Sequence, residues 1–257
     1  MKKFPDWSRK TAIFLFWLIL WQIFSHIVHN QILLVGPVDT MKALLEQLAS
    51  PPFWRAIWFS FGRISLGFFI AFLAGLLTGS LAFWKPLVDE FLAPAIQLMK
   101  SVPVASFVIL ALIWTGAENL SVFISFLVVY PVIHVNTLAG LSHADKNLLE
   151  MARVFRVPIW KQALYIYRIS LYPYLESGLK TALGMGFKSG IAAEVIGVPD
   201  GSVGEGLYMA KIYLSTAELF AWTLMIIAVS TVFEKLFLLI LRKTAGNGVM
   251  KKEEENG

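Results

Sequence analysis

Three features of the sequence predict an all-α polytopic membrane protein with about six transmembrane helices. Its 257 residues are 57% hydrophobic and only 15% charged, whereas soluble domains average about 45–50% apolar and about 25% charged residues. Phenylalanine, tryptophan and glycine number 20, 9 and 18, which suits helices that end at membrane interfaces. Several long stretches also lack charged residues. The absence of cysteine excludes disulfide scaffolds, thiolate metal sites and cysteine nucleophiles.

The first span is predicted at residues 11–28, which carry no charged side chain. The segment is long enough to cross a hydrocarbon core of about 30 Å. The basic residues before it would also suit a signal peptide. However, His26, His29 and Asn30 stand where a small-residue cleavage site would be needed. We therefore expect this helix to be retained in the membrane.

The second span is predicted at about residues 56–84. Its small residues Ala71, Gly75 and Gly79 recur every four positions. Residues at this spacing share one face of a helix, so a neighbouring helix can approach that face closely.

The remaining spans are less regular. Span three is predicted at 91–114, with a kink or break at Pro103, because proline removes a helical hydrogen bond. Span four is predicted at 119–141, and span six at 216–241. Span five, at about 177–197, is the most polar of the set.

Basic residues predict the orientation of these spans. Six crossings place both chain ends on one side, and the basic residues gather there and between spans four and five, at Lys2, Lys3, Arg9, Lys10, Lys146, Arg153, Arg156, Lys161, Arg168, Arg242, Lys243, Lys251 and Lys252. Because cytoplasmic loops are enriched in lysine and arginine, both termini should be cytoplasmic. The net charge of +5 is thus interpreted as topology, without a nucleic-acid partner. We expect one transmembrane domain over 1–257, with a disordered tail at about 245–257.

A long segment, about 142–171, separates spans four and five. Ala152 and Phe155 belong to a first stretch with helical spacing of apolar residues, Pro158 interrupts it, and Trp160 belongs to a second. This pattern predicts two short helices at the cytoplasmic face. Taken alone, it also fits an interfacial helix pair on anionic lipid head groups.

The order of residues in this segment and elsewhere resembles the permease subunit of binding-protein-dependent ABC importers of the nitrate, sulfonate and taurine type. The resemblance covers about 60–242. It is carried by Lys100-Ser101-Val102-Pro103-Val104, Asn136-Thr137-Leu138-Ala139-Gly140-Leu141, Glu150-Met151-Ala152, Tyr172-Pro173-Tyr174, Gly178-Leu179-Lys180 and Ala193-Glu194-Val195-Ile196-Gly197.

The chain departs from the family pattern at three places. Met151 replaces the first alanine of the Glu-Ala-Ala signature, and Arg156 replaces a glycine four residues after the second alanine. The third departure is Ile166-Tyr167-Arg168-Ile169, where the family has Ile-x-Leu-Pro.

The resemblance implies that the segment forms coupling helices that sit in a groove of a separate ATP-binding subunit. The residues expected at this contact are Glu150, Met151, Ala152, Arg153, Phe155 and Arg156. Glu150 would be a polar anchor, with Ala152 allowing close approach and Phe155 an apolar knob. Alternatively, Glu150 caps a helix or pairs with Arg153 or Lys146. Arg156 would either meet an acidic partner surface or extend to lipid.

The resemblance also implies a type I importer fold in a bacterial inner membrane and a set of partners. These are an ATP-binding subunit, an extracytoplasmic solute-binding protein, a second permease copy forming a homodimer, and the lipid bilayer. The chain has no Gly-x4-Gly-Lys-Ser/Thr phosphate loop; the nearest fragment, Gly186-Phe187-Lys188-Ser189, lacks the spacing. We expect a non-catalytic chain without its own cofactor, while ATP and Mg bind to the partner ATPase.

The translocation path is predicted to involve Lys188, Glu194, Ser101 and Pro103. Charged residues within a span usually face a bundle interior or a water-filled path. Lys188 near mid-span would suit an anionic solute, or it could pair with Glu194 or a helix carbonyl. The alternative for Glu194, which the position favours over a substrate ligand, is a structural hydrogen-bonding group near the outer face, and Lys180 can extend to lipid phosphates.

Two further questions remain open in the sequence. The alternative function is an ion-coupled secondary transporter that uses Lys188, Glu194 and His134 as a charge relay. The solute is not specified: a nitrate-, sulfonate- or taurine-like anion and a vitamin precursor both fit the resemblance. His26 and His29 alone make a poor metal site, so no metal site is predicted.

Overall fold

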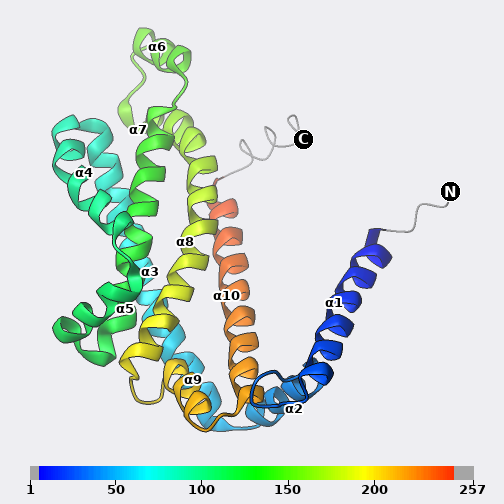
Figure 1. The fold of residues 1–257 in the computed structure, drawn as a ribbon. Helices are drawn as coiled ribbons and strands as arrows, with labels where there is room; N and C mark the ends of the chain where they lie inside the picture. The colour runs from blue at the N-terminus through cyan, green and yellow to red at the C-terminus, as the bar shows by residue number, and fades with distance from the viewer. Residues whose placement is uncertain (1–5, 246–257) are drawn as a thin grey trace.

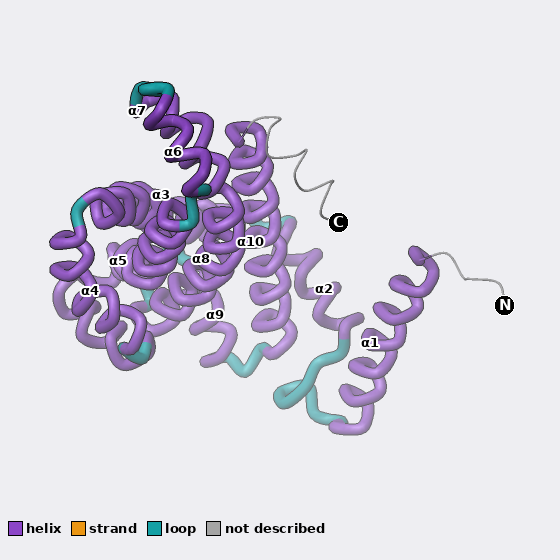
Figure 2. Tube along the Cα trace, turned by 90° about the horizontal axis from the view of Figure 1, so that it is seen from above, coloured by secondary structure: helices purple, strands orange, loops and turns teal. Residues whose placement is uncertain are grey.

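The computed structural model describes residues 6–245, and within them the chain forms helices joined by short turns, without a strand (Figure 1; Figure 2). The elements are α1 (Asp6–Val28), α2 (Pro37–Leu48), α3 (Pro51–Trp84), α4 (Pro86–Ser101), α5 (Val104–Ser142), α6 (Lys146–Val154), α7 (Ile159–Gln162), the π turn η1 (Ala163–Tyr167), α8 (Arg168–Gly197), α9 (Val203–Ile212) and α10 (Thr216–Ala245). The all-α prediction is confirmed. The predicted tail beyond Ala245 lies outside the described residues.

Proline and short polar residues determine where many helices start. Pro37, Pro51 and Pro86 are the first residues of α2, α3 and α4. Proline suits this position because its missing N–H would be unpaired there in any case. Asp145 and Ser202 precede α6 and α9, and their side chains accept hydrogen bonds from backbone N–H groups of the first turn.

Within the described residues, four segments are long and apolar enough to span a membrane: Arg9–Val28, Pro51–Trp84, Val104–Ser142 and Thr216–Leu241. They contain predicted spans one, two, four and six. Predicted span five lies within α8, which is 30 residues long and therefore about 45 Å. Its lysines and glutamates make it too polar to qualify by composition.

Predicted span three is divided between two helices, as the break at Pro103 required. Helix α4 ends at Ser101, and Pro103 is the residue before α5. A second interruption, which was not predicted, lies at Gly116, whose φ of 70° and ψ of 168° are not helical. It separates the end of predicted span three from predicted span four, and glycine tolerates this backbone conformation because it lacks a Cβ.

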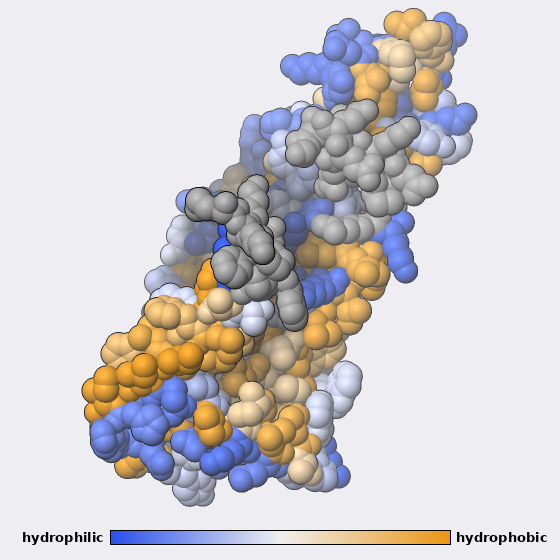
Figure 3. Space-filling model, turned by 90° about the vertical axis from the view of Figure 1, so that its right-hand side faces the viewer, coloured by the Kyte–Doolittle hydropathy of each residue, from blue (hydrophilic) through white to orange (hydrophobic). Residues whose placement is uncertain are grey.

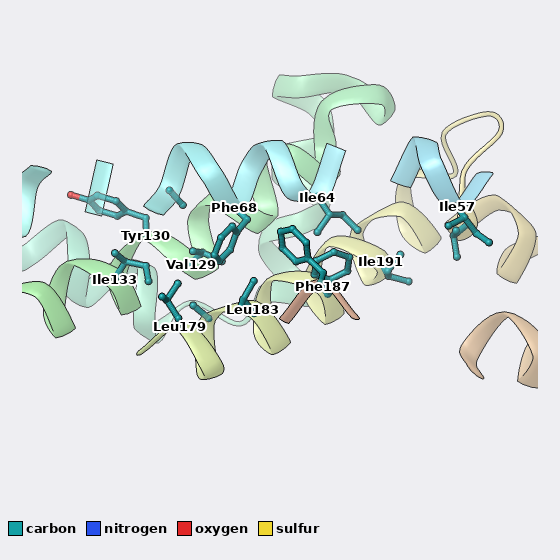
Figure 4. Packing of buried hydrophobic residues seen from close by; sticks show 14 of the residues in the cluster. Ile57, Ile64, Phe68, Val129, Tyr130, Ile133, Leu179, Leu183, Phe187 and Ile191 are labelled. Atoms are coloured by element: carbon teal, nitrogen blue, oxygen red, sulfur yellow. The ribbon is translucent and has the colours of Figure 1, made fainter. Parts of the chain in front are cut away.

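The centre of the bundle is formed by α3, α5 and α8, which pack along their length (Figure 1). Their apolar side chains interlock in one core, drawn in Figure 4, in which Ile64, Phe68 and Leu179 are fully or almost fully buried. A Cβ added to Gly75 would lie 2.8 Å from the Cβ of Ile133 on α5. The small residues of α3 therefore do face a closely packed helix, as their spacing predicted.

Helix α1 stands apart from this bundle (Figure 1; Figure 2). None of its spanning window is buried within the chain. Near its end, the Trp21 indole donates a hydrogen bond to the Val35 carbonyl and its ring contacts Phe220 on α10. An apolar helix of this length that buries none of its spanning window within the chain needs a lipid or protein environment.

The bundle has two distinct ends (Figure 1). One end carries α6 and α7, and is called the loop end here. The other carries α2 and α9, and is called the α9 end. Helix α8 runs from one to the other, and the π turn η1 and α7 continue it at the loop end without an intervening loop. The helical segment 159–197 thus connects both ends of the molecule.

Candidate functional site

The loop end contains the two short helices that the sequence predicted, and α6 projects from the bundle (Figure 1). Helix α6 starts after Asp145, whose Oδ1 accepts hydrogen bonds from the N–H groups of Asn147 at 2.9 Å and Leu148 at 3.5 Å. The helix cap is therefore Asp145, and Glu150 does not supply it.

The end of α6 is a Schellman motif. The Val157 N–H donates to the Ala152 carbonyl at 2.8 Å, and the Arg156 N–H donates to the Arg153 carbonyl at 3.1 Å. Val157 and Ala152 also pack together in a small apolar cluster. Arg156 has a φ of 49°, in the left-handed region that favours glycine. This explains physically why a glycine suits the position that Arg156 occupies.

The predicted coupling residues fall on two sides of α6. Glu150, Arg153 and Arg156 are exposed, as are Met151 and Phe155, and Phe155 keeps 74% of its surface accessible. Glu150 forms no ion pair with the described residues. Figure 3 shows hydrophobic and hydrophilic side chains interleaved at this projecting tip.

Ala152 has a different place from its neighbours. It is 1% exposed and packs against Ala144 and Ile166 inside the loop. Its small side chain thus permits close approach within the chain itself.

Helix α8 presents one continuous exposed stripe. Its members are spaced three or four residues apart and lie on one helix face: Pro173, Ser177, Thr181, Met185, Lys188, Ala192 and Ile196. Lys188 is exposed and forms no ion pair with the described residues. Lys180, by contrast, pairs with the buried Glu176 of the same helix at 3.0 Å. A stripe that contains a lysine without an ion-pair partner among the described residues is unfavourable against lipid.

Glu194 points away from this stripe and into the bundle. It is fully buried, and its Oε2 accepts a hydrogen bond from the Ser60 hydroxyl at 2.5 Å. Ser121 lies beside the same carboxylate, but Glu194 Oε1 has no hydrogen-bond partner among the described residues. Lys188 and Glu194 do not pair, so they have separate surroundings.

Ser101 and Pro103 lie at the exposed break between α4 and α5. The Ser101 hydroxyl donates to the Gln97 carbonyl of its own helix at 2.8 Å. His134 is buried in α5 and hydrogen-bonds through Nδ1 to the Thr78 hydroxyl at 2.8 Å. Among described residues, no group of three histidine, aspartate or glutamate side chains is placed to hold a metal ion.

Sequence reasoning missed one polar anchor, Arg63 on α3. Its guanidinium bonds the carboxylate of Glu118 at 2.6 Å and the side-chain oxygen of Asn119 at 3.2 Å, and it also donates to the Glu118 carbonyl. These contacts fix the turn after Gly116. The available signal was an arginine isolated within a predicted apolar helix, because such residues usually find a partner.

Comparisons with known proteins agree on one family of membrane transport components. Residues 67–245, more than half of the chain, match the family described as binding-protein-dependent transport system inner membrane component. A putative aliphatic sulfonates transport permease protein of Bacillus subtilis is 26% identical, over 87% of this chain and 82% of its own length. A nitrate import permease protein of Synechococcus elongatus is 27% identical, over 73% and 70%. A bicarbonate transport system permease protein of a Synechocystis species is 30% identical, over 63% and 57%.

Proposed function

The chain belongs to the family of binding-protein-dependent transport system inner membrane components, and from this premise we propose that it couples a separate ATPase to the import of a small anion. It is an ABC importer permease with the type I fold. In the proposed assembly a partner ATPase binds and hydrolyses ATP with Mg, a solute-binding protein delivers the solute, and this chain provides the path without catalysing a reaction.

The exposed tip of α6 supports the coupling role. Apolar side chains such as Phe155 and Val154 are 74% and 78% exposed there, with Arg153 and Arg156 beside them. Exposed apolar residues rimmed by charges are typical of protein interaction sites. A groove of the ATPase with an apolar floor and acidic edges would match this tip. Glu150 would accept a hydrogen bond from a donor at the edge of that groove.

Co-purification tests this contact. The chain is expressed with its cognate ATP-binding subunit, and retention of that ATPase is compared for Phe155→Ala, Glu150→Lys and the control Met209→Ala. Met209 is also exposed and apolar but lies at the α9 end. The two α6 variants should lose the ATPase, and the control should retain it. Equal retention in all three would contradict docking at α6.

The α8 stripe supports an anionic solute. Lys188 is its only charged member, and it has no anionic partner among the described residues. The names of the three relatives refer to aliphatic sulfonates, nitrate and bicarbonate, all of which are anions. An unpaired lysine beside the path would attract such solutes by its charge. Ser101 and Pro103, at the α4–α5 break, complete the proposed path.

Uptake by the reconstituted importer tests the role of Lys188, with nitrate, bicarbonate and an alkanesulfonate as probes. We expect Lys188→Gln to lower the uptake rate of the transported anion, because the attracting charge is lost. Lys180→Gln is the control, since Lys180 is already paired with Glu176. Unchanged uptake by Lys188→Gln, with normal ATPase retention, would remove Lys188 from the path.

A second copy of the chain would cover the faces that this copy leaves open. The α8 stripe, in which the charge of Lys188 is unpaired among the described residues, is unfavourable against lipid, so we propose a homodimer. In a bacterial inner membrane the loop end would face the cytoplasm, with both termini on that side.

Single cysteines test this orientation cleanly, because the chain has no cysteine of its own. Asn147→Cys at the loop end and Asp200→Cys at the α9 end are both exposed positions. In intact cells an impermeant thiol reagent should label only position 200. Labelling of position 147 alone would invert the proposed topology.

A further inference from the structure

A buried carboxylate joins three helices near the α9 end. The Ser60 hydroxyl of α3 donates to Glu194 Oε2 of α8 at 2.5 Å, and it accepts from the Val203 N–H at 2.9 Å. The Gly204 N–H also points to Glu194 Oε2, at 3.4 Å. Val203 and Gly204 are the first two residues of α9. Their N–H groups have no partner within the helix, and the helix N-terminus favours negative charge.

The first turn of α9 lies directly against α8 at this point. A Cβ added to Gly204 would overlap the Cβ and backbone carbon of Glu194. Ser60 is 2% exposed and Glu194 is fully buried. A buried carboxylate is costly unless hydrogen bonds compensate it. Here that compensation comes at Oε2, from Ser60 of α3 and Gly204 of α9, so the carboxylate ties these elements to α8.

Other capping contacts of α9 stay within its own loop. The Ser202 hydroxyl accepts from the Glu205 N–H at 2.9 Å, and Glu205 Oε2 accepts from the Gly201 N–H at 2.6 Å. These bonds stabilise the start of α9, but they make no contact with α8. The start of α9 therefore has two separate sets of contacts. Glu205 stabilises the first turn of α9 itself, and Glu194 joins that turn to α8.

We propose that Glu194 is a positioning residue for transport, which makes α9 and α8 move as one body when the solute-binding protein docks at the α9 end. This rests on the proposed function. Ile212, the last residue of α9, and Tyr213 after it are 54% and 77% exposed, and the family description itself names dependence on a binding protein. Helix α8 then carries the movement along the stripe with Lys188 and, through η1, to the loop end.

The test measures ATPase activity of the full complex in lipid nanodiscs, with and without saturating solute-binding protein. Three variants are compared with wild type: Glu194→Gln, Ser60→Ala and the matched control Glu205→Gln. The readout is the ratio of stimulated to basal activity, since a merely structural defect lowers both. Thermal unfolding of each purified variant checks that it folds. If Glu194→Gln does not fold, Ser60→Ala still tests the proposal, because it removes the same hydrogen bond from the other side.

We expect the ratio to fall about tenfold in Glu194→Gln and Ser60→Ala, as for the loss of a charge-assisted hydrogen bond, and to stay near wild type in Glu205→Gln. An equal fall in all three variants would mean that only the stability of α9 matters, and would overturn the proposal. A wild-type ratio in both Ser60→Ala and a Glu194→Gln variant that folds would also overturn the proposal. A wild-type complex without any stimulation would instead contradict the proposed function itself.

Discussion

The left-handed residue that ends α6 gives a quantitative prediction. Arg156 has a φ of 49°, a conformation that costs a residue with a Cβ about 1–2 kcal/mol. Glycine removes that cost but loses about 0.5–1 kcal/mol through the greater freedom of the unfolded chain. Arg156→Gly should therefore stabilise the folded loop by about 0.5–1 kcal/mol, a range centred on the difference between the midpoints of these two effects.

Hydrogen exchange is the appropriate assay, because a local loop can open without global unfolding. The Val157 N–H donates to the Ala152 carbonyl at 2.8 Å, so its exchange reports opening of this motif. A gain of about 0.5–1 kcal/mol corresponds to exchange about two- to fivefold slower. Phe155→Gly is the control: Phe155 has a φ of −81°, so glycine there brings only the entropic loss and faster exchange.

Faster or equal exchange in Arg156→Gly would refute the reasoning about strain. The same variant separates the two interpretations of the guanidinium. If Arg156 contacts an acidic ATPase surface, Arg156→Gly loses ATPase retention although its loop is more stable, whereas Arg156→Lys keeps both charge and strain. If the side chain meets only lipid, both variants retain the ATPase.

Two other predictions concern the bundle. Gly75→Ala should lower the thermal unfolding temperature, because its Cβ would stand 2.8 Å from that of Ile133 and overpacking costs about 1–3 kcal/mol. The control, Gly62→Ala, has open space around it and should leave that temperature unchanged or slightly raised. Equal effects of the two substitutions would contradict the packing argument. Arg63→Ala should destabilise the turn after Gly116 by about 1–2 kcal/mol, which is below the roughly 1.5–3 kcal/mol of a buried hydrogen bond to a charged group because the Glu118 side chain is 54% exposed. The readout is faster hydrogen exchange at Glu118 and its neighbours, and protection equal to wild type would show that the Arg63 contacts are dispensable.

Local patterns in the sequence were sufficient for much of the fold. Ala71 and Gly75 predicted a closely packed face on α3, and Pro103 and Pro158 predicted interruptions at which the helices do end. These features depend on spacing or on the missing proline N–H, and both can be recognised without knowing the neighbours. Span five was predicted at about 177–197 as the most polar of the set, whereas the composition of α8 does not qualify it as a span.

Long-range contacts account for what the sequence left open. Glu194 and Ser60 are separated by 134 positions, and Arg63 and Glu118 by 55. No periodicity links such pairs, so the sequence could not decide whether Glu194 faces the path, pairs with Lys188 or binds within the bundle. Likewise, the helical spacing of Ala152 and Phe155 could not distinguish the buried residue from the exposed one.

Two departures from the family pattern have opposite structural effects at the loop end. Arg156 takes a left-handed position that suits glycine, and it therefore strains the end of α6. Ile169 stands where the family has proline. Proline there would remove a backbone N–H and clash with the preceding turn, whereas isoleucine permits α7, η1 and α8 to form one uninterrupted helical segment. The segment that begins at α7 is thus attached to α8 more rigidly than a proline would allow, and a displacement of α8 at Glu194 can reach α7 without a flexible joint. Helix α6 is linked to this segment by the packing of Ala152 against Ile166.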